Sequence, residues 1–146
     1  MRNVFKYVAG LLTVFALVIG FNLNTAMAMP TYLNDGTLKL LSNDPVSDGY
    51  CYMDTSSIQV TDGGKDYYEI AVNIAVVDSS YNWNRTYPVY YRFYYNGIVE
   101  FTPGTGGWRN INDPNLNPMY KTGSGIILWY VNNSPKVQRQ FNALYE

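Results

Sequence analysis

Few residues in this chain can do chemistry, and the side chains on which most enzymes depend are missing. The sequence of 146 residues has no histidine and one cysteine, Cys51. Without histidine the chain lacks the commonest general base and metal ligand, and with them every Ser-His or Cys-His pair. One cysteine cannot build a zinc site or an internal disulfide, and we expect Cys51 to be a small buried hydrophobe. We therefore predict that the protein is not an enzyme, has no catalytic residues and needs no metal or other cofactor.

Carboxylates are the remaining catalytic candidates, because two of them are enough for glycoside hydrolysis. Glu69 and Glu100 both lie in stretches with the residue pattern of strands. Nothing in the sequence sets the distance between them, so carbohydrate cleavage stays an alternative to two ordinary surface acids. The aspartates in turns lack the alternating ligand spacing of a calcium loop. Residues 104–107 and 123–125 are rich in glycine but lack the flanking residues of a phosphate loop or a nucleophile elbow.

Aromatic side chains are the surplus of this sequence, which has 15 tyrosines and three tryptophans. Flat apolar rings with a polar edge are typical of protein interfaces and of platforms that stack on sugars. Two tryptophans lie in polar stretches next to an arginine, and the glycines before Trp108 offer nothing to bury it. Most of the tyrosines are expected to be core and sheet residues. As ligand-binding residues we predict Trp83, Arg85, Trp108 and Arg109.

The elements that must position these residues are organised around a tyrosine-rich hairpin from Tyr87 to Thr102. Asn96-Gly97 accepts the positive φ angles of a two-residue turn and separates two runs of β-branched and aromatic residues. Such a turn pairs the strands so that alternate side chains share a face. One predicted face is too apolar to stand bare in water without a covering layer. That face holds Tyr90, Arg92, Tyr94, Val99 and Phe101.

The stretch from Tyr67 to Val77 has the clearest strand pattern in the chain. Its even-numbered positions from 68 to 76 are apolar and share one face of a strand. A slip of one residue would turn that face to water, so the alternation fixes the register. Before it, residues 50–60 form a predicted strand that bends near Asp54 to Ser57, where short polar side chains compete for backbone hydrogen bonds.

In the C-terminal third, the sequence predicts a loop, a stretch that fits either a strand or a helix, and a final helix. Residues 103–118 have no period and are too long for an ordinary connection, which is typical of functional or loose loops. The apolar run from Ile126 to Val131 fits a buried strand or a buried helical turn, and its length and β-branched residues favour a strand. Ser134 and Pro135 predict the start of a helix over 135–145. Together these patterns predict an α+β fold, mainly an antiparallel β-sheet with a C-terminal helix packed on it.

The first 28 residues have the pattern of a secretory signal peptide. Arg2 and Lys6 precede an apolar run from Val8 to Phe21, and Ala26-Met27-Ala28 supplies the small residues of a cleavage site. The apolar run is shorter than the ~20 residues of a spanning helix. We therefore expect one exported domain, residues 29–146, in the extracellular space, on the cell surface or in the periplasm, with no stable membrane span after cleavage.

A run beginning at Tyr50 carries a resemblance to a known family. Tyr52, Asp54, Ser57 and Ile58 form a Tyr-x-Asp-x-x-Ser-Ile pattern, followed by an alternating Ile/Val strand and a tyrosine-rich one. Over about residues 38–101 this resembles the surface-adhesin protein E family and similar small exported bacterial proteins. The resemblance implies an antiparallel sheet backed by helix, display on a bacterial surface and binding to host matrix proteins. It also implies that the stretch near Ile126 is helical.

These observations predict an exported, non-enzymatic interaction module, adhesin-like, that uses exposed aromatics to bind a host or envelope protein or a glycan. The alternatives are a carbohydrate-binding or carbohydrate-cleaving domain that uses Trp83, Trp108 and Glu100, and an envelope structural protein that dimerises through a strand edge. The formal net charge of the full chain is −1. Without a basic excess, nucleic acid is not an expected partner.

Overall fold

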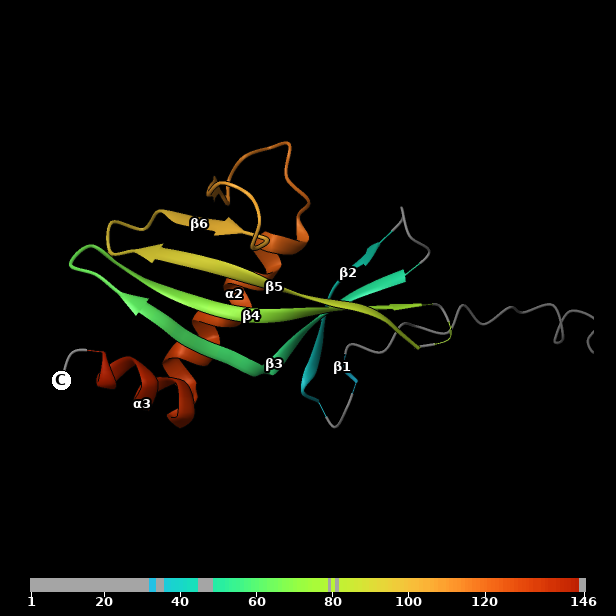
Figure 1. Ribbon diagram of the computed structural model, residues 1–146, viewed down its shortest axis with the longest axis horizontal. Coiled ribbons are helices and arrows are strands. Elements are labelled where there is room, and N and C mark those ends of the chain that lie inside the picture. Colours follow the sequence, from blue (N-terminus) through green and yellow to red (C-terminus); the bar gives the residue numbers. More distant parts are fainter. Residues whose placement is uncertain (1–31, 34–35, 45–48, 79, 81, 145–146) are drawn as a thin grey trace, which may run out of the picture. The chain divides into compact units, whose positions relative to one another are not determined.

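The computed structural model describes residues 32–33, 36–44, 49–78, 80 and 82–144, and the predicted signal peptide lies outside them. Their strands form one antiparallel sheet in which each strand pairs with the next along the chain. Two helices follow the strands (Figure 1). The predicted α+β fold with a helix packed on an antiparallel sheet is therefore confirmed. The elements are β1 (Tyr32–Leu33), β2 (Leu38–Asp44), β3 (Gly49–Gly63), β4 (Tyr67–Asp78), β5 (Trp83–Tyr94), β6 (Val99–Thr102), β7 (Arg109–Asn110), α2 (Met119–Asn133) and α3 (Pro135–Ala143).

Strand β4 is the centre of the sheet, and its predicted alternation is confirmed. Ile70, Val72, Ile74 and Val76 keep at most 1% of their accessible surface. They lie in one core with buried residues of β3, β5 and β6 and with Ile127 and Val137 of the two helices. Burying an aliphatic side chain contributes about 1.5–3 kcal/mol, so these four side chains stabilise the fold by an amount comparable to its expected net stability.

The predicted bend in β3 is also confirmed. Its pairing with β4 shifts between Asp54 and Gln59. The Asp54 carboxylate accepts hydrogen bonds from the backbone N–H and the hydroxyl of Ser56, and the Ser57 hydroxyl donates to the Asp54 carbonyl. The same Ser57 hydroxyl accepts the backbone N–H of Asn73 in β4. Short polar side chains thus replace the ladder bonds that the bend interrupts.

The hairpin between β5 and β6 exists, but the predicted two-residue turn is wrong. The Tyr94 N–H donates to the Ile98 carbonyl over 2.9 Å and the Gly97 N–H donates to the Tyr94 carbonyl over 3.0 Å. The loop therefore has three residues, and Gly97 takes the positive φ of +88° that closes such a turn. The extra residue shifts the register by one, so that Arg92 lies opposite Glu100 and Tyr91 opposite Phe101.

The shift changes which face each β6 residue occupies. Val99 and Phe101 lie with Tyr91 and Phe93 on the core side, and not with Arg92 as predicted. Phe101 is buried at 1% exposure and stacks on Tyr120 of α2 with 4.2 Å between ring centroids. Helix α2 therefore covers Phe101, whereas Tyr90, Arg92 and Tyr94, which were predicted to share its face, lie half-buried on the other side of the sheet.

Helix α2 corrects the prediction of a strand over Ile126 to Val131. The apolar run is the second half of a helix that begins at Met119, where the Asn117 side chain accepts the Met119 N–H. Its buried positions follow the helical spacing of three to four residues, at Met119, Gly123, Ser124 and Ile127. A window of six residues was too short to display this period, and the helical structure that the family resemblance implied is the one observed.

Helix α3 confirms the prediction of a C-terminal helix that begins at Pro135 after Ser134. Ser134 occupies the N-cap position, although its hydroxyl makes no capping hydrogen bond. Val137 is buried and Phe141 packs edge-on against Tyr68 of β4 at 5.2 Å. Cys51 is buried, as expected, and is not part of a disulfide. In the described part of the chain, neither helix is long and apolar enough to cross a membrane.

Candidate functional site

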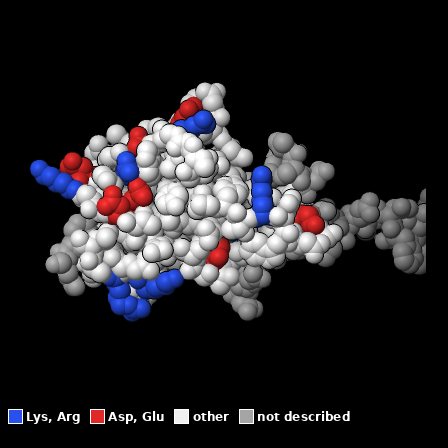
Figure 2. All heavy atoms as spheres, in the orientation of Figure 1, with Lys and Arg blue, Asp and Glu red and all other residues white. Residues whose placement is uncertain are grey.

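The two faces of the sheet differ in their cover. Both helices pack on one face, and Figure 1 views the sheet from the opposite side, where no described helix lies across the strands. On that side Figure 2 shows acidic and basic side chains close together near the left end and others around the rim, with a central area that has no acidic or basic residue. We call this side the open face.

A row of polar side chains crosses the open face from β3 to β7. The register places Asp62 opposite Glu69, Glu69 opposite Arg92, Arg92 opposite Glu100 and Glu100 opposite Asn110. Residues that are directly opposite on neighbouring strands point to the same face. We call these five residues the open-face row. The three-residue hairpin loop creates it, because the predicted register would have put Glu100 on the other face.

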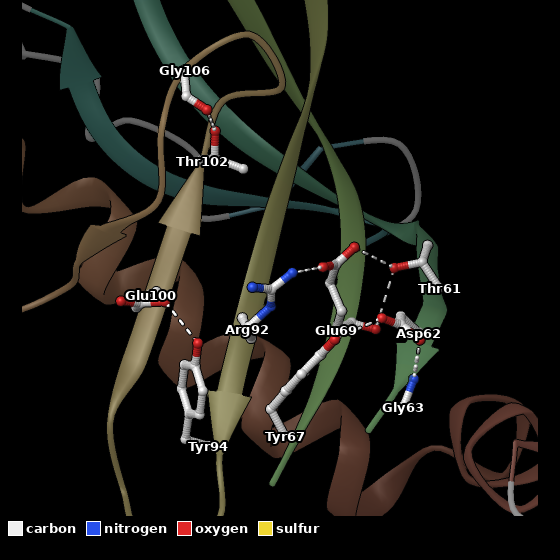
Figure 3. Close-up of polar contacts among 10 residues, drawn as sticks. All are labelled: Thr61, Asp62, Gly63, Tyr67, Glu69, Arg92, Tyr94, Glu100, Thr102 and Gly106. Carbon is white, nitrogen blue, oxygen red and sulfur yellow. Dashed lines mark hydrogen bonds and ion pairs between the residues drawn. The ribbon is translucent and has the colours of Figure 1, made fainter. Parts of the chain in front are cut away.

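Arg92 lies at the centre of the row and is held from several directions. Its guanidinium forms an ion pair with Glu69 over 2.9 Å (Figure 3). Its guanidinium carbon lies 4.5 Å from the ring centroid of Tyr67 and 4.0 Å from that of Trp108. Cations within about 6 Å of an aromatic centroid are attracted by the ring. Tyr67, Arg92 and Trp108 therefore form one stack, which we call the open-face stack.

The carboxylates around the stack are held by neighbouring hydroxyls. Tyr94 donates its hydroxyl to Glu100 over 3.0 Å, and Tyr67 donates to Asp62 over 2.9 Å (Figure 3). Glu69 also accepts the Thr61 hydroxyl at 3.1 Å. Each acid is fixed in place by at least one donor, so the surface has few rotatable groups left to order when a ligand binds.

The electrostatics keep the centre of the site charged. Burial acts to lower the pKa of Arg92, but its hydrogen bonds to Glu69 and Tyr94 outweigh burial and raise it. The hydrogen bond to Asp62 raises the pKa of the Tyr67 hydroxyl. Arg92 is thus a permanent cation and Tyr67 a neutral donor over the whole physiological range of pH.

The geometry bears on the catalytic alternative. Glu69 and Glu100 share the open face but stand on strands two apart, with Arg92 between them. The two oxygens of Glu69 bind Arg92 and Thr61, respectively. A glycosidase needs one carboxyl free to protonate the leaving oxygen and a second free to act on the sugar or on water. The occupied oxygens of Glu69 do not favour this role.

The four predicted ligand-binding residues are not brought together. Trp83 is 53% exposed but begins β5, about 30 Å of extended strand from Arg92. It belongs to the strand and not to the preceding loop. Arg85, near it, lies over the ring of Tyr87 at 5.8 Å. Trp108 joins the open-face stack, whereas Arg109 lies opposite the buried Phe101 and faces the helix side.

Sequence reasoning missed the partners of Trp108 within the site. Arg92 was visible as the one cation in the tyrosine-rich run from Tyr87 to Tyr95, and that isolation was the available signal. Tyr67 and Glu69 become its neighbours only through the pairing of β4 with β5, and Glu100 only through the three-residue loop. Register, which the residue types alone did not determine, assembles the site.

Among the described residues, no group of three or more His, Cys, Asp or Glu side chains is placed to hold a metal ion. That the protein needs neither stays a prediction. Comparison with known proteins finds no match among family models, curated proteins or solved structures.

Proposed function

We propose that this protein is an exported, non-enzymatic interaction module that binds a protein partner on the open face of its sheet. The observation that carries the proposal is the open-face stack, in which Arg92 is held between Tyr67 and Trp108 on the side that the helices leave uncovered. Tryptophan, tyrosine and arginine are the residue types most enriched among those that dominate binding energies at protein interfaces.

The rigidity of the stack supports the same role. Ordering a long side chain at an interface costs about 0.5–1.5 kcal/mol, which a side chain already fixed before binding does not lose. Arg92 is fixed by Glu69, and the side chains of this pair keep only 22% and 14% of their accessible surface. A partner that docks here meets a surface whose charged groups are already paired and whose rings are already oriented.

The resemblance to the surface-adhesin protein E family points to the class of partner, a host or envelope protein met outside the cytoplasm. The residues that carry this resemblance have structural roles in the present chain. Tyr52 and Ile58 are buried, and Asp54 and Ser57 hold the bend of β3. The proposal of an adhesin-like role therefore rests on the resemblance and on the predicted signal peptide. The proposed place of contact rests on the geometry of the open face.

A specific observation supports each of the two alternatives, glycan binding and a structural role in the envelope. Glycan binding is favoured by the half-buried rings that lie beside the carboxylates of Asp62 and Glu100 on one face. Dimerisation as an envelope structural protein is favoured by the edge of β5, where residues 83–89 pair with β4 but not with β6. Pro88 lacks an N–H on that strand, which blunts this edge as a template for a further strand.

Binding of purified protein to immobilised matrix proteins and to a glycan array, with one variant and a matched control, tests the proposal. Trp108→Ala removes a ring of the stack, and Trp129→Ala removes a 55% exposed ring of α2 on the other side of the sheet. We expect Trp108→Ala to weaken protein binding by about tenfold or more and Trp129→Ala to leave it unchanged. Binding of glycans alone would favour the first alternative, and no binding to either panel would overturn the proposal.

A further inference from the structure

A cavity on the helix side of the sheet takes no part in the open face. It has a volume of about 240 Å³ and lies between the end of β6, the loop that follows it and the start of α2. Phe101, whose ring is buried under α2, lines its inner end. The polar and apolar groups around its mouth include Gly106, Arg109, Asn115, Leu116, Asn117 and Tyr120.

Arg109 is the charged group of the cavity. In the part of the chain that the structure describes, no carboxylate forms an ion pair with its exposed guanidinium. The nearby acid of the same loop, Asp113, is engaged in its own turn, where it accepts the backbone N–H of Asn115 at 2.9 Å and its side-chain amide at 3.2 Å. A guanidinium presents a planar fork of donors that matches a carboxylate in two hydrogen bonds.

Tyr120, which lines the cavity, lies within the influence of two arginines. The Tyr120 hydroxyl forms a hydrogen bond with Tyr87. Burial raises the pKa of Tyr120, while that bond and the positive charges of Arg109 and Arg85 act to lower it. Both arginines are therefore close enough to act on the same hydroxyl. Of these two arginines, Arg109 lines the cavity itself.

The remaining lining fits a small polyhydroxylated ring. The Asn117 side-chain oxygen accepts the Met119 N–H over 3.0 Å, which fixes the amide and leaves its NH₂ group to donate. Asn115 adds a second amide, and amides can both donate to and accept from hydroxyls. Leu116 and the ring of Tyr120 supply apolar surface. The volume is below the roughly 300–1,000 Å³ of pockets for drug-sized ligands, so the occupant is about one ring in size.

We infer that this cavity binds a single acidic sugar unit, with its carboxylate on Arg109, its hydroxyls on Asn115 and Asn117 and its ring against Tyr120. The inference is independent of the open face. Arg109 points to the helix side of the sheet, while Trp108, one residue before it, points to the other. Failure of one site therefore leaves the other intact.

Calorimetric titration of the purified protein with methyl glucuronide, with methyl glucoside as its neutral counterpart and with acetate as the bare carboxylate, tests the inference. Arg109→Gln removes the charge at the cavity, and Arg139→Gln removes an exposed charge of α3 as the matched control. We expect the glucuronide to bind wild type at least about tenfold more tightly than either other probe, and Arg109→Gln to lose that preference. Arg139→Gln and Trp108→Ala should bind it as wild type does.

Each other outcome would overturn the inference in a recognisable way. Equal binding of glucuronide and glucoside would show that the carboxylate is not recognised, and equal binding of acetate would show an anion site without a sugar ring. No binding of glucuronide, or unchanged binding by a folded Arg109→Gln variant, would remove the site altogether. Loss of glucuronide binding in Trp108→Ala would show that the two sites are not separate.

Discussion

Two glycines of α2 provide a sharp test of how this helix packs on the sheet. A Cβ atom at Gly123 would lie 2.5 Å from the Tyr91 hydroxyl oxygen and 3.1 Å from the end of the Met53 side chain, whereas a Cβ at Gly125 would meet nothing within 4 Å. Both positions lie inside the same helix. Gly123→Ala and Gly125→Ala therefore change helix propensity equally but differ in packing.

The magnitudes follow from these contacts. Alanine in place of glycine stabilises a helix interior by about 1 kcal/mol, so Gly125→Ala should raise the free energy of unfolding by about that amount. Adding a methyl group to a filled core costs about 1–3 kcal/mol, and Tyr91 has 0% exposure and little room to move. Gly123→Ala should therefore be about 1–3 kcal/mol less stable than Gly125→Ala, which is the packing cost alone.

Urea unfolding of the two variants measures this difference directly. Tyr91→Phe supplies a second arm, because the Tyr91 hydroxyl is buried and makes no hydrogen bond within the described residues. Its loss should cost little, and it should make room for the methyl group, so Gly123→Ala should be less harmful in the Tyr91→Phe background. Equal stabilisation by Gly123→Ala and Gly125→Ala would refute the close approach of α2 to β5.

Two further predictions concern the core. Val72→Asp puts an unpaired charge at a position with 1% exposure and should unfold the domain. Ala71→Asp, on the half-buried open face, is the control and should keep a cooperative thermal transition. An unchanged thermal midpoint for Val72→Asp would show that the core is misplaced. Burial raises the pKa of four tyrosine hydroxyls above the ordinary value of about 10, those of Tyr68, Tyr87, Tyr91 and Tyr120. Their contribution to the free energy of unfolding is therefore complete below about pH 10, the pKa in the unfolded chain, and is lost as the pH rises through their pKa in the folded state. Urea midpoints should therefore fall above about pH 10, and ionisation of these tyrosines, followed by absorbance, should coincide with unfolding.

The parts of the fold that were predicted are those where local pattern and tertiary structure agree. Burial on one face of β4 requires alternation, and the burial pattern alternates from Tyr67 to Ile74, beyond which Ala75 and Val77 are buried as well. The bend of β3 follows from side chains that bond to their own backbone. Helix α3 begins at a serine and a proline whose conformational preferences are local. None of these features depends on a distant partner.

The predictions of the hairpin turn and of a strand over Ile126 to Val131 were wrong because both features depend on residues outside the stretch of sequence that was considered. Asn96-Gly97 fits a two-residue turn as well as the last two positions of a three-residue loop, and the observed register places Val99 and Phe101 in the core. In α2 the run from Ile126 to Val131 lacks the polar positions that reveal a helical period, because both faces of this part of the helix are apolar. Tertiary burial decided both cases.

The candidate site could be predicted only in part for the same reason. Trp108 was identified from its flanking glycines and lies in the open-face stack. Its sequence neighbour Arg109 was predicted to act with it, but alternate residues of an extended chain point to opposite faces. The observed partner, Arg92, comes from another strand. Proximity in sequence therefore paired Trp108 with Arg109, whereas the pairing of strands brings Trp108 to Arg92.

The central claim is that the open-face stack is the surface that meets the partner. A double-mutant cycle on Arg92→Met and Trp108→Ala, measured as the dissociation constant for the matrix protein that binds wild type most tightly, tests it most directly. Because the guanidinium and the ring touch, we expect each variant to weaken binding and the double variant to lose less than the sum, with a coupling of about 0.5–2 kcal/mol. Additive losses, or unchanged binding by folded Arg92→Met, would contradict the account.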